Sequence, residues 1–139
     1  ITQNRAKGKQ TFIFIYEIYL LFQHEYSANF LFTLWKRVRK YGAYATGITQ
    51  NVDDLLQSHT ARTMLANSEF LIMLNQASTD RIELAKLLNI SDLQLSYITN
   101  VDAGHGLIKV GSSLVPFANK FPKNTKLYKL MTTKPGEGV

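Results

Sequence analysis

Glu17 is the first residue of this sequence whose type and position could carry chemistry. It follows the apolar run 11–15 and Tyr16, and it is the only carboxylate among residues 1–24. Ligands of open α/β sheets gather where the strands end, and a carboxylate there can hold Mg²⁺ or activate water for phosphoryl transfer. Burial in this apolar stretch would raise the pKa of Glu17 and make it a usable base. Alternatively, Glu17 only marks the point where a strand leaves the protein interior.

Thr49 and Gln50 form a second polar strand end, after the apolar segment 43–48. A glutamine in that place can donate a hydrogen bond to a γ-phosphate or orient the attacking water. The alternative is that Gln50 is simply the polar start of a loop.

A basic cluster lies between these two segments, at Lys36, Arg37, Arg39 and Lys40. The arginine guanidinium matches the geometry of a phosphate, so an arginine here could contact the nucleotide of a neighbouring subunit in a ring-shaped motor. Alternatively, the cations stabilise the carboxyl end of a helix through its dipole.

The elements expected to position these residues alternate between strands and helices. Apolar runs predict strands at 11–15, 43–48 and 70–74, since runs without alternation suit a sheet covered on both faces. Helices are expected between them, at 27–41, 53–67, 79–88 and 91–98. This alternation predicts an α/β fold whose parallel sheet is flanked by helices.

The ends of these elements have recognisable signals. Ser27, Thr79 or Asp80, and Ser91 are expected to cap helices, and Gly42 to stop one. A β-hairpin is expected over 104–117, turning at Gly111-Ser112. We expect a single domain over 1–139, with a loop at 1–10, a core at 11–117 and a basic strand and tail at 118–139 that frays after Pro135.

Composition excludes several classes of site. The 139 residues contain no cysteine, so a disulfide scaffold and thiolate metal sites are ruled out. The three histidines, His24, His59 and His105, lie too far apart for a metal site, and no metal is expected to bind them. No apolar run approaches the ~20 residues that a membrane-spanning helix needs. The net charge is +6, with basic ends and a mildly acidic middle.

Five stretches in order carry a resemblance to a known family: 14–22, 34–42, 46–56, 74–81 and 104–108. Together they make the chain similar to the C-terminal ATPase domain of type IV secretion and conjugal-transfer ATPases (VirB/Tra-type), in the form found on conjugative elements of Gram-positive bacteria. The resemblance covers nearly the whole chain, from residue 11 to about residue 135.

The resemblance implies a partial RecA-like fold of the FtsK/HerA-like group of ring motors, with ATP and Mg²⁺ as cofactors. Glu17 would match the Walker B glutamate, Gln50 the sensor, and Arg39 or Arg37 the arginine finger, with Thr49 and Tyr16 lining the nucleotide. Implied partners are other subunits of the ring, secretion-channel proteins and DNA. The implied location is cytoplasmic, peripheral to the inner face of the plasma membrane.

Two departures from the family pattern concern activity. Tyr16 stands where the family has an aspartate, and a phenol is neutral at pH 7 and cannot replace that charge. The motif Gly-x-x-x-x-Gly-Lys-Ser/Thr does not occur in the 139 residues, and Gly104-His105-Gly106 precedes a strand rather than a helix. We therefore expect a C-terminal fragment that is inactive alone and does not bind ATP tightly.

Two other functions remain open from the residues. Residues 79–117 could form a winged-helix-like nucleic-acid-binding module, although the expected second helix, 91–98, contains no lysine or arginine. The lysines of the tail, with apolar residues between them, could contact DNA, acidic lipid or a protein, or could guard a solvated edge strand. Incomplete cover of the sheet faces at Phe12/Phe14 and Ile13/Ile15 predicts self-association.

Overall fold

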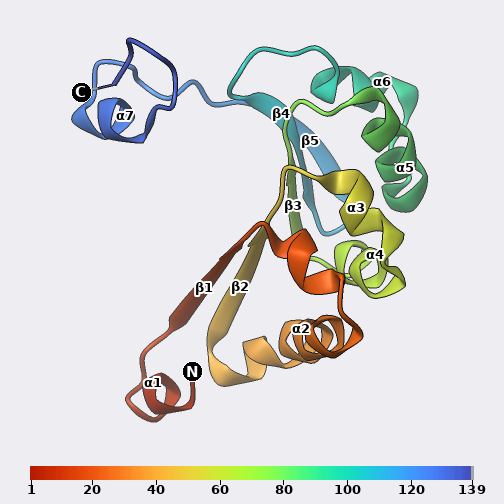
Figure 1. Ribbon diagram of the computed structural model, residues 1–139, viewed down its shortest axis with the longest axis vertical. Coiled ribbons are helices and arrows are strands. Elements are labelled where there is room, and N and C mark those ends of the chain that lie inside the picture. The colour runs from red at the N-terminus through yellow and green to blue at the C-terminus, as the bar shows by residue number, and fades with distance from the viewer. Residues whose placement is uncertain (139) are drawn as a thin grey trace. The chain divides into compact units, whose positions relative to one another are not determined.

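The computed structural model describes residues 1–138 and divides the chain into two compact units. The first unit contains residues 1–69 and 79–89, and the second contains residues 70–78 and 90–138 (Figure 1). The expectation of a single domain spanning the chain stays a prediction.

A two-stranded parallel sheet organises the first unit. Strands β1 (Thr11–Tyr16) and β2 (Ala43–Ile48) lie side by side, with Thr11 opposite Ala43 and Tyr16 opposite Ile48 (Figure 1). The crossover between them consists of the 3₁₀ helix η1 (Ile18–Phe22), helix α2 (Glu25–Arg37) and the 3₁₀ helix η2 (Val38–Tyr41). The strands and the crossover helix predicted from the apolar runs are therefore confirmed.

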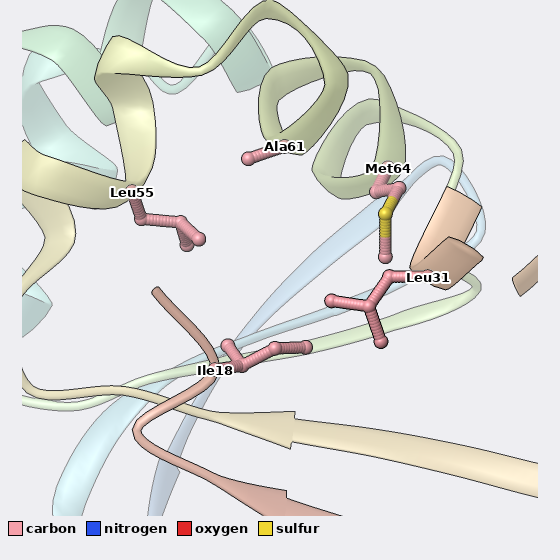
Figure 2. Close-up of a cluster of buried hydrophobic side chains, with 5 residues drawn as sticks. All are labelled: Ile18, Leu31, Leu55, Ala61 and Met64. Atoms are coloured by element: carbon pink, nitrogen blue, oxygen red, sulfur yellow. The ribbon is translucent and has the colours of Figure 1, made fainter. Parts of the chain in front are cut away.

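Further helices complete this unit: α3 (Val52–Gln57), α4 (His59–Ala66) and most of α5 (Ser78–Leu88). The core cluster contains Ile18, Leu31, Leu55, Ala61 and Met64, whose side chains point toward one another from η1, α2, α3 and α4 (Figure 2). Because these residues are at most 5% exposed, they hold the segment after β1 against the helices.

Three predicted boundaries in the first unit are wrong. Neither Thr79 nor Asp80 caps a helix, because α5 already begins at Ser78. Residues 1–10 are not all loop, because Thr2–Ala6 forms the short helix α1. Ser27 does not cap α2: the helix begins two residues earlier, and the Ser27 hydroxyl donates to the His24 carbonyl at 3.0 Å. At the other end, Gly42 has a φ of +63° and closes η2, as predicted.

The second unit contains a three-stranded antiparallel sheet with the order β3-β4-β5, formed by β3 (Phe70–Met73), β4 (His105–Val110) and β5 (Ser113–Ala118). The hairpin turning at Gly111-Ser112 is confirmed. The expectation that 70–74 joins the parallel sheet is wrong, because β3 pairs with β4.

Close packing explains this pairing. A Cβ atom at Gly106 would overlap the Met73 carbonyl oxygen, so the glycine allows β3 to approach β4. Leu107 beside it is fully buried, which places the apolar stretch of the hairpin in the core of the unit. Gly106 thus allows close packing of the strands. Gly104 and Gly106 lie at the start of a strand, as predicted, and not at the start of a helix as in a phosphate loop.

The expected helix 91–98 is formed by α6 (Asp92–Leu95) and the 3₁₀ helix η3 (Ser96–Ile98). Ser91 caps it as predicted, in a reciprocal capping box with Gln94. The α-helical part has only four residues, and the Gln94 side chain is engaged by the Ser91 backbone N–H at 3.0 Å. The helix that would enter a nucleic-acid groove is therefore short, and its Gln94 side chain is already hydrogen-bonded in the cap.

The strand expected within the basic segment 118–139 is a helix, α7 (Lys126–Met131). Thr125 caps it by accepting a hydrogen bond from the Tyr128 N–H at 3.2 Å, and the lysines at 126 and 129 follow the three-residue helical spacing. The segment after Pro135 does not simply fray, because Lys123 binds the Glu137 carboxylate at 3.0 Å. Within residues 1–138, no helix has the length and apolar character needed to cross a membrane.

Candidate functional site

The carboxyl ends of β1 and β2 bring the two predicted polar strand ends to one edge of the sheet. Tyr16 pairs with Ile48 at the last position of the ladder, so Glu17 and Thr49 are the first residues beyond it on the two strands. Gln50 follows and is exposed. The parallel register therefore unites Glu17 with Thr49 and Gln50.

Glu17 is held in an unusual backbone conformation. Its φ of +52° and ψ of +47° lie in the left-handed region, and its carbonyl accepts the Leu20 N–H at 3.1 Å to begin η1. The other non-glycine residues with positive φ are Asn89 and Asn100 within residues 1–138, and asparagine tolerates this region far better than glutamate. Strain of this kind is typical of functional positions, and it lies here at the half-buried residue where β1 passes into η1.

Tyr16 is 65% exposed, and its phenol is influenced by the adjacent Glu17. A hydrogen bond to the Glu17 side chain, together with the charge of that carboxylate, raises the pKa of the Tyr16 phenol above its ordinary value. The phenol is therefore neutral at pH 7 and supplies no second negative charge beside Glu17.

Thr49 orders the turn that follows β2. Its hydroxyl accepts the Asn51 N–H at 3.1 Å and donates to the Asn51 carbonyl at 3.2 Å. Asn51 in turn caps α3 by accepting the Asp54 N–H at 3.3 Å. Asn51 and Asp54 were not among the residues predicted from the sequence, although an asparagine before a helix with an aspartate in its first turn is a helix-start signal.

The basic cluster lies at the other edge of the sheet. Arg37 ends α2 and Arg39 lies in η2, just before β2 begins at Ala43 opposite the first residue of β1. Arg37 also lines an open, largely apolar depression with Tyr41 and the first residues of the chain. Both arginines are exposed, and the structure does not bring them together with Glu17 and Gln50.

Comparison with known proteins identifies the family. Residues 2–109 match the family described as the TraG P-loop domain. This chain belongs to that family. It is thus a domain of the type IV secretion and conjugal-transfer ATPases, as the resemblance in the sequence predicted.

A solved structure supports the TraG-type assignment. The structure of VirB4 of Thermoanaerobacter pseudethanolicus is similar with a TM-score of 0.75 and 25% sequence identity, over 81% of this chain. The chain spans 31% of the length of that VirB4 chain. No curated protein matches the sequence. The VirB4-like α/β fold is therefore shown, with the parallel pair and the antiparallel sheet described above.

P-loop ATPases of this family use ATP with Mg²⁺, so the residues at the sheet edge can be tested against that group. Mg²⁺ prefers carboxylate oxygens and octahedral geometry, and the strand ends offer Glu17 beside the neutral Tyr16. Within residues 1–138, no three histidine, cysteine, aspartate or glutamate side chains cluster in space so that they could hold a metal ion. Neither 10–35 nor 41–61 contains a lysine or arginine for the phosphates. The strand ends thus offer one carboxylate and no cation, and these residues by themselves do not fit a complete ATP–Mg²⁺ site.

Proposed function

We propose that this chain supplies one wall of the nucleotide site in a motor ATPase that powers DNA or protein transfer during conjugation or type IV secretion. The observation that carries the proposal is the β1–β2 register, which brings Glu17 and the Thr49-Gln50 pair to one sheet edge. The phosphate-gripping loop would come from sequence outside these 139 residues, which is consistent with the 31% share of the VirB4 chain that is covered.

In this proposal Glu17 is the Walker B glutamate and Gln50 is the sensor, with Tyr16 and Thr49 beside the nucleotide. Arg39 or Arg37 is the arginine finger. Because both arginines precede β2, at the edge away from Glu17, they would act on the nucleotide of an adjacent subunit rather than on their own.

The partners proposed are the other subunits of a ring motor, secretion-channel proteins and DNA. The proposed location is the cytoplasm, at the inner face of the plasma membrane. These assignments rest on family membership and on the similarity to VirB4.

A mixing experiment in the full-length protein tests the division of roles between subunits. Glu17→Gln and Arg39→Ala should each abolish ATP turnover. Mixed oligomers of the two variants should regain part of it, because some interfaces combine an intact Glu17 with an intact Arg39. Arg37→Ala tested in the same way decides which arginine is the finger.

Matched controls keep this test specific. Glu25→Gln and Arg62→Ala change exposed residues of α2 and α4 and should leave turnover unchanged. If mixed oligomers form but neither arginine variant complements Glu17→Gln, the proposed roles are wrong.

The isolated chain offers a simpler measurement. Calorimetric titration with Mg²⁺–ATP should show no binding tighter than about millimolar, since one carboxylate and no strand-end cation face the nucleotide. Micromolar affinity would show that the chain contains a complete site and would contradict the proposal.

A further inference from the structure

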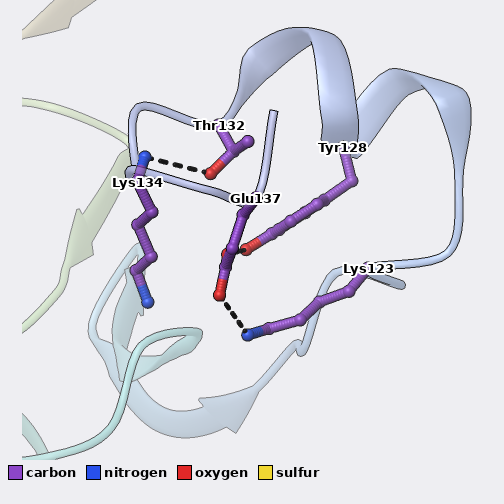
Figure 3. Close-up of polar contacts among 5 residues, drawn as sticks. All are labelled: Lys123, Tyr128, Thr132, Lys134 and Glu137. Carbon is purple, nitrogen blue, oxygen red and sulfur yellow. Dashed lines mark hydrogen bonds and ion pairs between the residues drawn. The ribbon is translucent and has the colours of Figure 1, made fainter. Parts of the chain in front are cut away.

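The C-terminal residues 120–138 close on themselves around Tyr128. Its hydroxyl donates to the Glu137 carboxylate, and Lys123 binds the same carboxylate at 3.0 Å (Figure 3). The ring of Phe121 stacks on Tyr128 at 6.4 Å between centroids, and the Lys123 ammonium lies 5.9 Å from the centroid of the Tyr128 ring. These contacts fix the side of α7 that faces the rest of this segment.

A second side of α7 is apolar and exposed. Leu127, Leu130 and Met131 are 56%, 63% and 73% exposed, and helical spacing places all three on one face. Lys126 borders that face beside Leu130, Lys129 lies on the far side of the helix, and both lysines are exposed. The arrangement reverses that of an ordinary surface helix, which turns its apolar face inward.

The segment is strongly basic. Residues 120–138 contain five lysines and one acidic residue, Glu137. That carboxylate is already engaged, since the hydrogen bonds from Tyr128 and Lys123 lower its pKa. In the described part of the chain no carboxylate forms an ion pair with Lys120, Lys126, Lys129 or Lys134.

We propose that α7, with Lys126 and Lys129, forms a surface that binds anionic phospholipid membranes. Leu127, Leu130 and Met131 would enter the boundary between headgroups and acyl chains, while the lysines would remain among the anionic headgroups. Each lysine near such a surface adds electrostatic attraction. The proposal rests on the proposed function only in placing the protein at a membrane, and it needs no nucleotide.

Two other occupants fit this surface less well. Protein interfaces are depleted in lysine relative to the rest of the surface, whereas α7 carries two lysines within its six residues. Nucleic acid would neutralise the lysines through its phosphates but would leave Leu127, Leu130 and Met131 exposed to water. A lipid surface satisfies both the charge and the apolar face.

Vesicle flotation with the 139-residue chain tests the proposal, because flotation separates bound protein from any self-associated protein that would sediment. The chain should float with phosphatidylcholine vesicles containing ~30% phosphatidylglycerol, and binding should weaken with added salt because screening reduces the attraction. Binding to pure phosphatidylcholine should be much weaker.

Two double variants separate the two contributions. Lys126→Gln with Lys129→Gln should lower the partition coefficient by about 30-fold, as expected for two lysines. Leu127→Gln with Leu130→Gln should lower it by more than about tenfold through lost apolar burial. The matched controls are Lys7→Gln with Lys9→Gln, at exposed residues near the amino terminus, and Leu93→Gln, at a side chain that is 75% exposed; both should bind as the unmodified chain does.

Three results would overturn the proposal: no flotation with anionic vesicles, equal losses in the controls, or binding that ignores lipid charge. Duplex DNA binding that the lysine variants abolish, together with unchanged flotation of the leucine variant, would assign the surface to nucleic acid instead. Turnover assays on the full-length protein address the nucleotide site separately, so either proposal can fail without the other.

Discussion

At the scale of single residues, the pair Tyr16-Glu17 defines what the sheet edge can do. The phenol lies beside the carboxylate and stays neutral, because Glu17 raises its pKa. If Tyr16 occupies the position of the family's Walker B aspartate, the site has lost one of two negative charges that would otherwise face Mg²⁺.

Replacing Tyr16 by aspartate should therefore raise ATP turnover in the full-length protein. The new carboxylate would restore the missing charge, and the exposed position should accommodate the smaller side chain. Steady-state turnover with Mg²⁺ measures the effect, and Tyr16→Asn controls for the loss of the ring. Equal turnover of Tyr16→Asp and the unmodified protein would show that the second charge is not what limits activity.

The Tyr16 phenol should titrate above the ordinary tyrosine pKa of 10.0. Glu17→Gln removes the charge and should return the pKa toward that value, whereas Glu25→Gln should not. Because the raised pKa means that folding favours the protonated phenol, its stabilising contribution is present below about pH 10 and is lost as the phenol ionises at higher pH. NMR titration of the Tyr16 ring resonances measures the shift, and an unchanged pKa in Glu17→Gln would contradict this account.

The positive φ of Glu17 predicts a difference between two substitutions that both remove the carboxylate. Glu17→Gly should be more stable than Glu17→Ala by about 1 kcal/mol, because glycine adopts the left-handed region without the Cβ conflict. Chemical denaturation of both variants provides the comparison. Equal stabilities would mean that the backbone relaxes out of this conformation.

At the scale of elements, glycines set how closely the strands and helices approach. A Cβ at Gly106 would meet a backbone carbonyl, that of Met73. A Cβ at Gly47 would lie 2.7 Å from the Ile18 Cδ1 atom, the end of a side chain. The backbone carbonyl is held in the β3–β4 ladder, whereas the isoleucine can rotate.

Gly106→Ala should consequently destabilise the protein more than Gly47→Ala does. Overpacking against backbone is expected to cost about 3 kcal/mol or more, against about 1 kcal/mol where a side chain can shift. Thermal denaturation followed by circular dichroism measures both, and Gly136→Ala, where no atom lies within 4 Å but φ is positive, reports the cost of the backbone conformation without crowding. A larger loss for Gly47→Ala would reverse this assignment.

Element types were predictable where the local signal was strong. The continuous apolar runs identified β1, β2 and β3, Ser91 identified the start of α6, and Gly111-Ser112 identified the hairpin turn. The carboxyl-terminal helix was missed, because lysines separated by apolar residues suit either an edge strand or a helix until the Thr125 cap and the Tyr128 contacts decide between them.

At the scale of the whole molecule, apolar surface remains exposed on the parallel sheet. One face of β1 carries Phe12, Phe14 and Tyr16, which are 61%, 70% and 65% exposed, and Phe12 stacks on Tyr44 of β2. The other face, with Ile13 and Ile15, is half-buried. The predicted exposure is thus concentrated on the aromatic face.

This aromatic face should drive self-association of the isolated chain. Sedimentation velocity should show larger species as the concentration rises, and Phe12→Ser with Phe14→Ser should suppress them through loss of apolar contact area. Phe70→Ser, at a side chain on β3 that is 64% exposed, is the control. A strict monomer at high concentration would contradict the prediction.

The candidate site was predictable only in part from the sequence. The residue types of Glu17 and Gln50, each directly after an apolar run, were enough to expect both at a sheet edge. That they share one edge depends on β1 and β2 pairing in parallel and in register. No residue pattern in the sequence specified the left-handed backbone conformation of Glu17 at the turn into η1. The same holds for the contact with Glu17 that raises the pKa of the Tyr16 phenol.

The sequence by itself determined the family, the order of most elements and the residues with chemical potential, because these depend on composition and local spacing. The tertiary structure decided which strands are partners: β3 joins the antiparallel hairpin because Gly106 lets the Met73 carbonyl come close. It also decided which surfaces remain exposed, since the Tyr128 contacts turn the apolar face of α7 outward. Both decisions depend on contacts between residues distant in sequence, and local pattern does not encode them.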